Sequence, residues 1–71
     1  MPRKGKKRPI QVWGADLTNG DRVNAGENDI VSVIVHGDRT VTVTDVHNDE
    51  KVLLDDEGEP VNWTGYVPRQ N

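Results

Sequence analysis

The sequence predicts a small all-β domain, a five-stranded antiparallel meander or barrel, behind a basic leader. Valine dominates the apolar residues of the chain, and β-branched residues such as valine and threonine favour strands because they pack well on a pleated surface. Strand-like runs alternate with short turn sequences. No segment shows the 3.6-residue apolar period of a helix, so we expect little or no helix.

Residues 1–9 form the leader, a block of positive charge with two prolines and one glycine. Its cationic residues are Arg3, Lys4, Lys6, Lys7 and Arg8. Because such a stretch cannot bury enough apolar surface to offset its ordering entropy, we expect a disordered tail followed by one domain over residues 10–71.

The first strand is expected over residues 10–17, where Ile10, Val12 and Leu17 are the apolar positions. The stretch "LTNGDRVNAGEND" that follows is rich in turn residues. Its Asn19-Gly20 pair adopts positive φ easily and can close a hairpin between residues 10–17 and 21–25.

The runs "DIVSVIV", "TVTVTDV", "KVLLDD" and "PVNWTGYV" predict four further strands. Between them, Gly37-Asp38, Asn48-Asp49 and Glu57-Gly58 are compatible with two-residue hairpin loops. These loops fix the register, and the three choices agree on one apolar face. The members of that predicted face are Ile30, Ile34, Val41, Val43, Val52, Leu54, Val61 and Trp63, with Ser32, Asp45 and Asp56 as polar exceptions.

The opposite face, with Val31, Val33 and Val35 beside Thr40, Thr42 and Thr44, is mixed. We expect the first strand, or curling of the sheet on itself, to cover part of it.

The C-terminal "WTGYVPRQN", residues 63–71, resembles the last strand of SH3 domains, in which a run like its Gly65-Tyr66-Val67-Pro68 precedes the final strand. The resemblance covers about a tenth of the chain and implies an SH3-like barrel. It does not imply binding of proline-rich peptides, because the acidic loop and the adjacent aromatic pair of that family have no counterpart here.

The net charge of −3 is the sum of two opposite regions, since residues 10–71 carry all 12 acidic residues against Arg22, Arg39, Lys51 and Arg69. Such a domain, rich in Asp, Val and Thr and free of Cys, is similar in composition to halophilic proteins from salt-saturated cytoplasms. Dense carboxylates keep a surface hydrated when salt screens ordinary repulsion. An ordinary acidic domain from a high-GC bacterium or its phage is the alternative.

The sequence predicts neither an enzyme nor a metal or cofactor site. His36 and His47 flank predicted hairpin loops, where histidine is usually a solvated turn residue. Asp45 falls on the predicted core face, and we interpret it as lying at a sheet margin or bulge rather than as a catalytic group. The carboxylates of Asp55, Asp56, Glu57 and Glu59 lack the spacing of a Ca²⁺ loop.

Nucleic-acid binding, to DNA or RNA, is the leading functional hypothesis. The leader's five cations can neutralise phosphates without fixed geometry. Aromatic side chains on small barrels stack on bases, and the candidates are Trp13 and Tyr66, because the predicted register places Trp63 in the core.

The competing hypothesis is a protein-interaction or accessory module, of viral type for example, that binds through its acidic surface or an open sheet edge. Such an acidic surface can dock a basic partner or imitate nucleic acid. In a further variant, the leader folds back on its own acidic domain.

No apolar run approaches the ~20 residues of a membrane span, and the leader lacks the apolar centre of a secretory signal. We therefore expect a cytoplasmic protein with no membrane partner. The sequence does not decide between DNA and RNA, or between monomer and homodimer.

Overall fold

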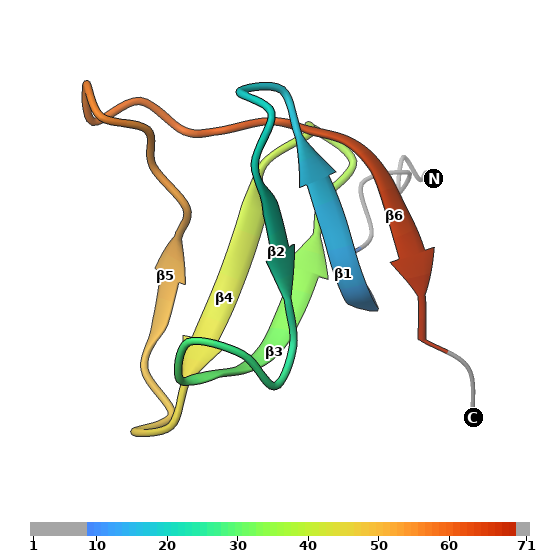
Figure 1. The fold of residues 1–71 in the computed structure, drawn as a ribbon, viewed down its shortest axis with the longest axis vertical. Coiled ribbons are helices and arrows are strands. Elements are labelled where there is room, and N and C mark those ends of the chain that lie inside the picture. The colour runs from blue at the N-terminus through green and yellow to red at the C-terminus, as the bar shows by residue number, and fades with distance from the viewer. Residues whose placement is uncertain (1–8, 70–71) are drawn as a thin grey trace, which may run out of the picture.

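The computed structural model describes residues 9–69, which form six β-strands and no helix (Figure 1). The strands are β1 (Ile10–Leu17), β2 (Arg22–Asn24), β3 (Ile30–Val35), β4 (Val41–Asp45), β5 (Glu50–Val52) and β6 (Trp63–Pro68). The predicted all-β class is confirmed. The five predicted strands correspond to β1, β3, β4, β5 and β6, and the predicted hairpin after Leu17 supplies β2. The predicted disordered leader, apart from Pro9, lies outside the described residues.

All pairings are antiparallel, and the sheet order is β2-β1-β3-β4-β5, with β6 added to the other edge of β1. The first half of β1 pairs with β3 and the second half with β2, so this strand organises the sheet. The sheet curls into a half-barrel that stays open between β2 and β5, since neither of these has a second strand partner among the described residues (Figure 1).

The core consists of small apolar side chains on the concave side of the sheet. Val12, Ala15, Leu17, Val23, Val33, Val35, Val41, Val43 and Val61 are buried, and Ala25, Ile30, Leu53, Trp63 and Tyr66 pack against them. β1, β3 and β4 supply the most deeply buried members, Val12, Ala15, Val33, Val35 and Val41.

The predicted register between β3 and β4 is wrong by one residue. Val33 pairs with Val43 and Val35 with Val41, so Val33 and Val35 enter the core in place of Ile34 and Ser32. The loop has three residues, not two, because Arg39 adopts a left-handed φ of 79° before His36 pairs with Thr40. A one-residue slip exchanges the two faces of a strand.

The other two loops also have three residues rather than two, with left-handed residues at Asn48 and Gly58; the first spans residues 46–48 and so begins two residues earlier than predicted, and the second spans residues 56–58. Val43 therefore pairs with Lys51, and Leu53 rather than Leu54 pairs with Val61. As a result Val52 and Leu54, which were predicted to be in the core, are 46% and 54% exposed.

Candidate functional site

Trp13 is the most accessible aromatic side chain of the described residues and lies in the first half of β1, beside the end of β6. It is 47% exposed, and the Arg69 guanidinium carbon lies 4.4 Å from the ring centroid. A cation over an indole face at this distance is held by the ring quadrupole. The antiparallel pairing of β1 with β6 creates this contact, because Pro68 pairs with Val12 and Arg69 follows directly.

A β-bulge turns Trp13 outward. The register between β1 and β6 shifts between Val12 and Gly14, whose partners are Pro68 and Val67, so Trp13 is the extra residue on β1. A bulge re-aims a side chain while the flanking residues keep their pairing. Val12 thereby stays fully buried, and its large aromatic neighbour faces solvent.

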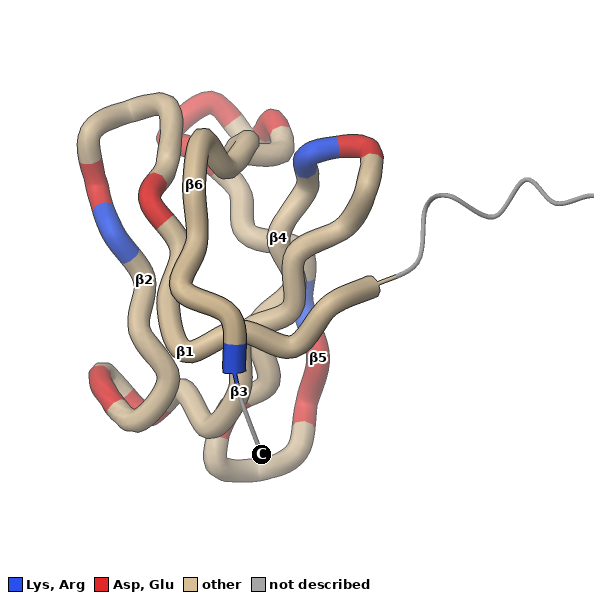
Figure 2. The backbone as a smooth tube through the Cα atoms, turned by 90° about the vertical axis from the view of Figure 1, so that its right-hand side faces the viewer, with Lys and Arg blue, Asp and Glu red and all other residues tan. Residues whose placement is uncertain are grey.

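The chain around Trp13 carries no carboxylate. Neither Asp nor Glu occurs in residues 9–15, 30–35 or 60–69, which contain the start of β1, all of β3 and all of β6. The acidic residues lie mainly in the loops and on β5, with Asp16 the only one on β1, β3 or β6 (Figure 2). We call residues 9–15 with residues 65–69 the neutral end; it is the part of the domain to which the leader is joined.

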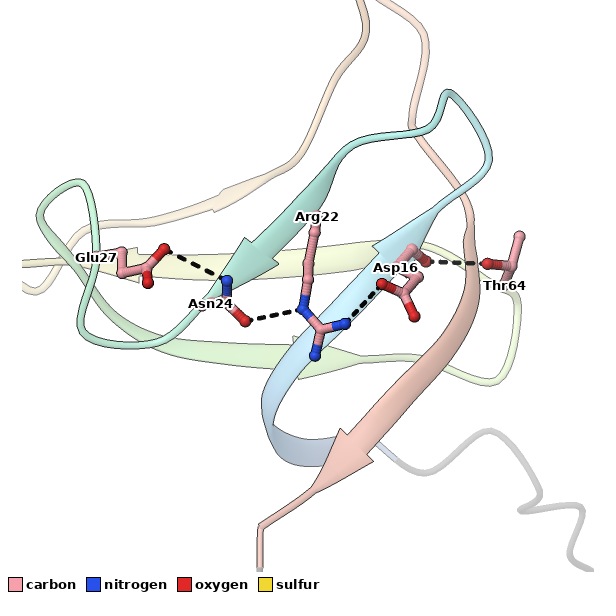
Figure 3. Close-up of polar contacts among 5 residues, drawn as sticks. All are labelled: Asp16, Arg22, Asn24, Glu27 and Thr64. Carbon is pink, nitrogen blue, oxygen red and sulfur yellow. Dashed lines mark hydrogen bonds and ion pairs between the residues drawn. The ribbon is translucent and has the colours of Figure 1, made fainter.

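A polar chain on the outer side of β1 and β2 holds a second arginine close to this end (Figure 3). Arg22 donates from Nη1 to Asp16 Oδ1 at 2.8 Å and from Nε to Asn24 Oδ1 at 3.1 Å. Asn24 in turn donates to Glu27 at 3.3 Å. The side chains of Arg22 and Asn24 lie over Gly14, where even a Cβ would collide with the Asn24 amide oxygen.

Tyr66 does not lie beside Trp13. Its strand partner is Ala15, which is fully buried, and its ring packs against the core with an edge-to-face contact to Trp63 at 5.2 Å. Both aromatic rings are partly buried. The two predicted aromatic candidates are therefore separated by the sheet, one outside it and one inside.

Trp63 is fixed by its own contacts. Its indole N–H donates to the His36 carbonyl at 2.9 Å, and the Arg39 guanidinium carbon lies 4.5 Å from its ring centroid. His36 Nε2 is 2.8 Å from the Thr42 hydroxyl oxygen. The contacts of Trp63 join the β3–β4 hairpin to β6, and the His36–Thr42 contact lies within the hairpin.

The carboxylates flagged by the sequence have local structural partners. Asp45 ends β4, and its Oδ1 accepts the backbone N–H groups of Asp49 at 3.1 Å and His47 at 2.8 Å. The bond from Asp49, reinforced by that from His47, holds the pKa of Asp45 below its usual range. Asp55 binds the N–H groups of Glu57 and Glu59 in the same way. Within residues 9–69 no group of three or more His, Cys, Asp or Glu side chains is placed to hold a metal ion.

Sequence reasoning missed Arg22 and Arg69 as candidate site residues. Arg69 was overlooked because only the pairing of β1 with β6 brings it to Trp13. The leader residues Arg3, Lys4, Lys6, Lys7 and Arg8 lie outside the described residues. No family model, no curated protein and no solved structure matches this chain. No helix that could cross a membrane occurs in the described part of the chain.

Proposed function

We propose that this protein is a non-enzymatic nucleic-acid-binding protein, in which the leader contacts phosphates and the neutral end contacts bases. One observation carries the proposal: the exposed Trp13, with Arg69 stacked on it, lies on the strand that the leader enters, in a part of the domain without carboxylates. Aromatic stacking combined with cationic contacts is the usual chemistry of binding to single strands without sequence preference.

The distribution of charge supports the same proposal. A domain with 12 carboxylates repels a phosphate backbone, but the repulsion between exposed charges falls off over about 10 Å at 0.1 M salt. The carboxylates lie mainly in the loops and on β5. A nucleic-acid strand that runs from the leader to Trp13 therefore avoids most of them. Arg22 adds a guanidinium on the outer side of β2, although Asp16 neutralises part of its charge.

The proposal is tested by titrating the protein with single-stranded and duplex DNA, and with the corresponding RNA, at two salt concentrations. We expect binding that weakens steeply with salt, because the leader releases counterions from phosphates. Absence of binding to all four ligands at low salt would refute the proposal.

A second candidate function, binding of a protein partner, is favoured by the exposed edge of the sheet at β5. Val52 and Leu54 are half-exposed there, and β5 pairs with β4 alone among the described strands. Such an edge can accept a strand from another chain. Deleting residues 1–9 separates the two candidates, because it removes the contact with phosphates and leaves this edge unchanged.

We also propose a cytoplasm rich in salt as the setting of the domain, and an SH3-like arrangement as the nearest description of its barrel. The first rests on the dense exposed carboxylates of the loops, and the second on the "GYVP" run, which forms the second half of β6. Unfolding followed at increasing potassium chloride tests the salt-rich setting. A domain of unchanged stability at low ionic strength would argue for the ordinary acidic alternative.

A further inference from the structure

A groove lies on the open side of the half-barrel, between β2 and the chain that follows β5. Its volume is about 290 Å³. The apolar side chains that line it are Leu17, Val23, Leu53, Leu54 and Val61, and the polar ones are Asn19, Asp21 and Arg22. Leu54 is 54% exposed, so part of this apolar lining faces solvent.

One side of the groove is formed by a strand with an unpaired edge. β2 pairs with β1 alone among the described strands, whereas on the other side Leu53 and Leu54 already pair with Val61 and Pro60. An edge of this kind presents backbone N–H and C=O groups to an incoming extended segment. The groove therefore has the form of a site for an extended peptide.

One end of the groove is acidic. A pocket of about 270 Å³ adjoins it through the shared residues Asn19 and Asp21, and Asp55, Asp56 and Glu57 complete its lining. The Asp55 carboxylate already accepts the N–H groups of Glu57 and Glu59. The other carboxylates of this lining, Asp21, Asp56 and Glu57, are exposed and can form ion pairs with a cationic ligand.

The leader has the matching chemistry. It contains five of the nine basic residues of the chain, together with Met1, Pro2 and Pro9 as apolar groups. The remaining cations, Arg22, Arg39, Lys51 and Arg69, are spread singly over the domain.

The distance along the chain limits whether the leader's cations can reach the acidic pocket of their own molecule or only that of a second copy. The leader is joined to Ile10, at the opposite end of β1 from Leu17 and the acidic pocket, roughly 23 Å away at ~3.3 Å per residue. At the same extension the Cα atom of Arg8 reaches only about 7 Å from Ile10, and even with an extended side chain only the charged groups of Arg3 and Lys4 span the distance. Within one molecule, most of the cations cannot meet the pocket.

We propose that the leader of one copy binds the acidic groove of a second copy. Its cations pair with Asp21, Asp56 and Glu57, and its extended backbone lies along the open edge of β2. This inference rests on the proposed function in one respect: a leader held in a groove is withheld from phosphates, so self-association and nucleic-acid binding compete.

The test is sedimentation equilibrium of the full chain at low and high salt, without nucleic acid. We expect association that grows with concentration at low salt and disappears at high salt. The variant D21N/D56N/E57Q should abolish it. The matched variant D29N/D49N/E50Q removes three carboxylates from the opposite end of the sheet and should leave it intact.

A labelled peptide of residues 1–10 gives a second measurement on the full chain, at concentrations too low for self-association. Fluorescence anisotropy should show binding that is about tenfold weaker for D21N/D56N/E57Q than for D29N/D49N/E50Q, as expected for the loss of three exposed ion pairs. A monomer at every concentration, or equal effects of the two variants, would overturn the inference. Neither experiment contains nucleic acid. A negative result would therefore overturn self-association alone and would leave the proposed nucleic-acid binding unaffected.

Discussion

The two ends of β1 differ in what they offer a ligand. At its start lie Trp13 and Arg69, without a carboxylate, and the leader joins the domain there. At its finish lie Leu17 and the acidic pocket with Asp21, Asp56 and Glu57. The contrast shows that a net charge of −3 describes neither end, and that a chain of 71 residues can separate two surfaces of different chemistry along one strand.

Neutralising the leader is expected to have the largest effect. Replacing Arg3, Lys4, Lys6, Lys7 and Arg8 by Gln removes up to five phosphate contacts and should weaken binding to DNA or RNA by at least about a hundredfold at low salt. Circular dichroism should show an unchanged domain, because the core lies entirely within residues 12–61. Binding that kept its strength and its salt slope would place the nucleic-acid contact elsewhere.

Trp13→Ala is expected to have the next largest effect. Loss of one base-stacking contact is worth ~1–3 kcal/mol, so affinity for a single strand should fall by about tenfold. Leu54→Ala is the matched control, since it truncates a similarly exposed apolar side chain near the acidic pocket. Equal losses for the two variants would mean that Trp13 has no specific part.

Replacing one cation at a time is expected to lower the affinity for nucleic acid less, and it tests Arg69 separately from the other cations. Arg69→Gln and Lys51→Gln each lower the charge by one, but only Arg69 stacks on Trp13. We expect affinity to fall about threefold for Arg69→Gln, beyond the change for Lys51→Gln, measured at the same salt concentration. A larger loss for Lys51→Gln would move the site to the β5 edge.

The smallest expected effect concerns the loop between β4 and β5. The pKa of Asp45 is lower in the folded protein than in the unfolded chain. Its ionised carboxylate therefore stabilises the fold at pH values above the unfolded-state pKa. This stabilisation is lost as the pH falls through the pKa of the folded state. Unfolding free energies measured from pH 7 downward should therefore decrease less steeply for Asp45→Asn than for the original chain. Parallel pH profiles would contradict this assignment.

The sequence predicted the elements of the fold better than their register. The strand limits at Ile10 and Leu17 follow from apolar spacing and turn residues, and they agree with β1. The loop lengths could not be predicted, because a left-handed conformation at Arg39 is rare for a residue with a Cβ. That single residue moves Val33 and Val35 from the predicted outer face to the core.

The site was predictable only in part. The leader and Trp13 stand out from composition and from the scarcity of aromatic residues. The neutral end does not, since it arises when the antiparallel pairing of β1 and β6 brings Arg69 to Trp13. Tyr66 was chosen as a surface candidate because the predicted register placed Trp63 in the core, and its pairing with Ala15 turns it inward as well.

The most direct test of the account is the mapping of amide chemical-shift changes when the ¹⁵N-labelled full chain is titrated with a single-stranded oligonucleotide. We expect the largest changes at Trp13, Gly14, Val67 and Arg69, together with the Trp13 indole N–H, and little change at Asn19, Asp21, Leu54 and Glu57. Changes concentrated around Asp21 and Leu54, or none in the domain at all, would contradict the assignment of the neutral end as the nucleic-acid surface.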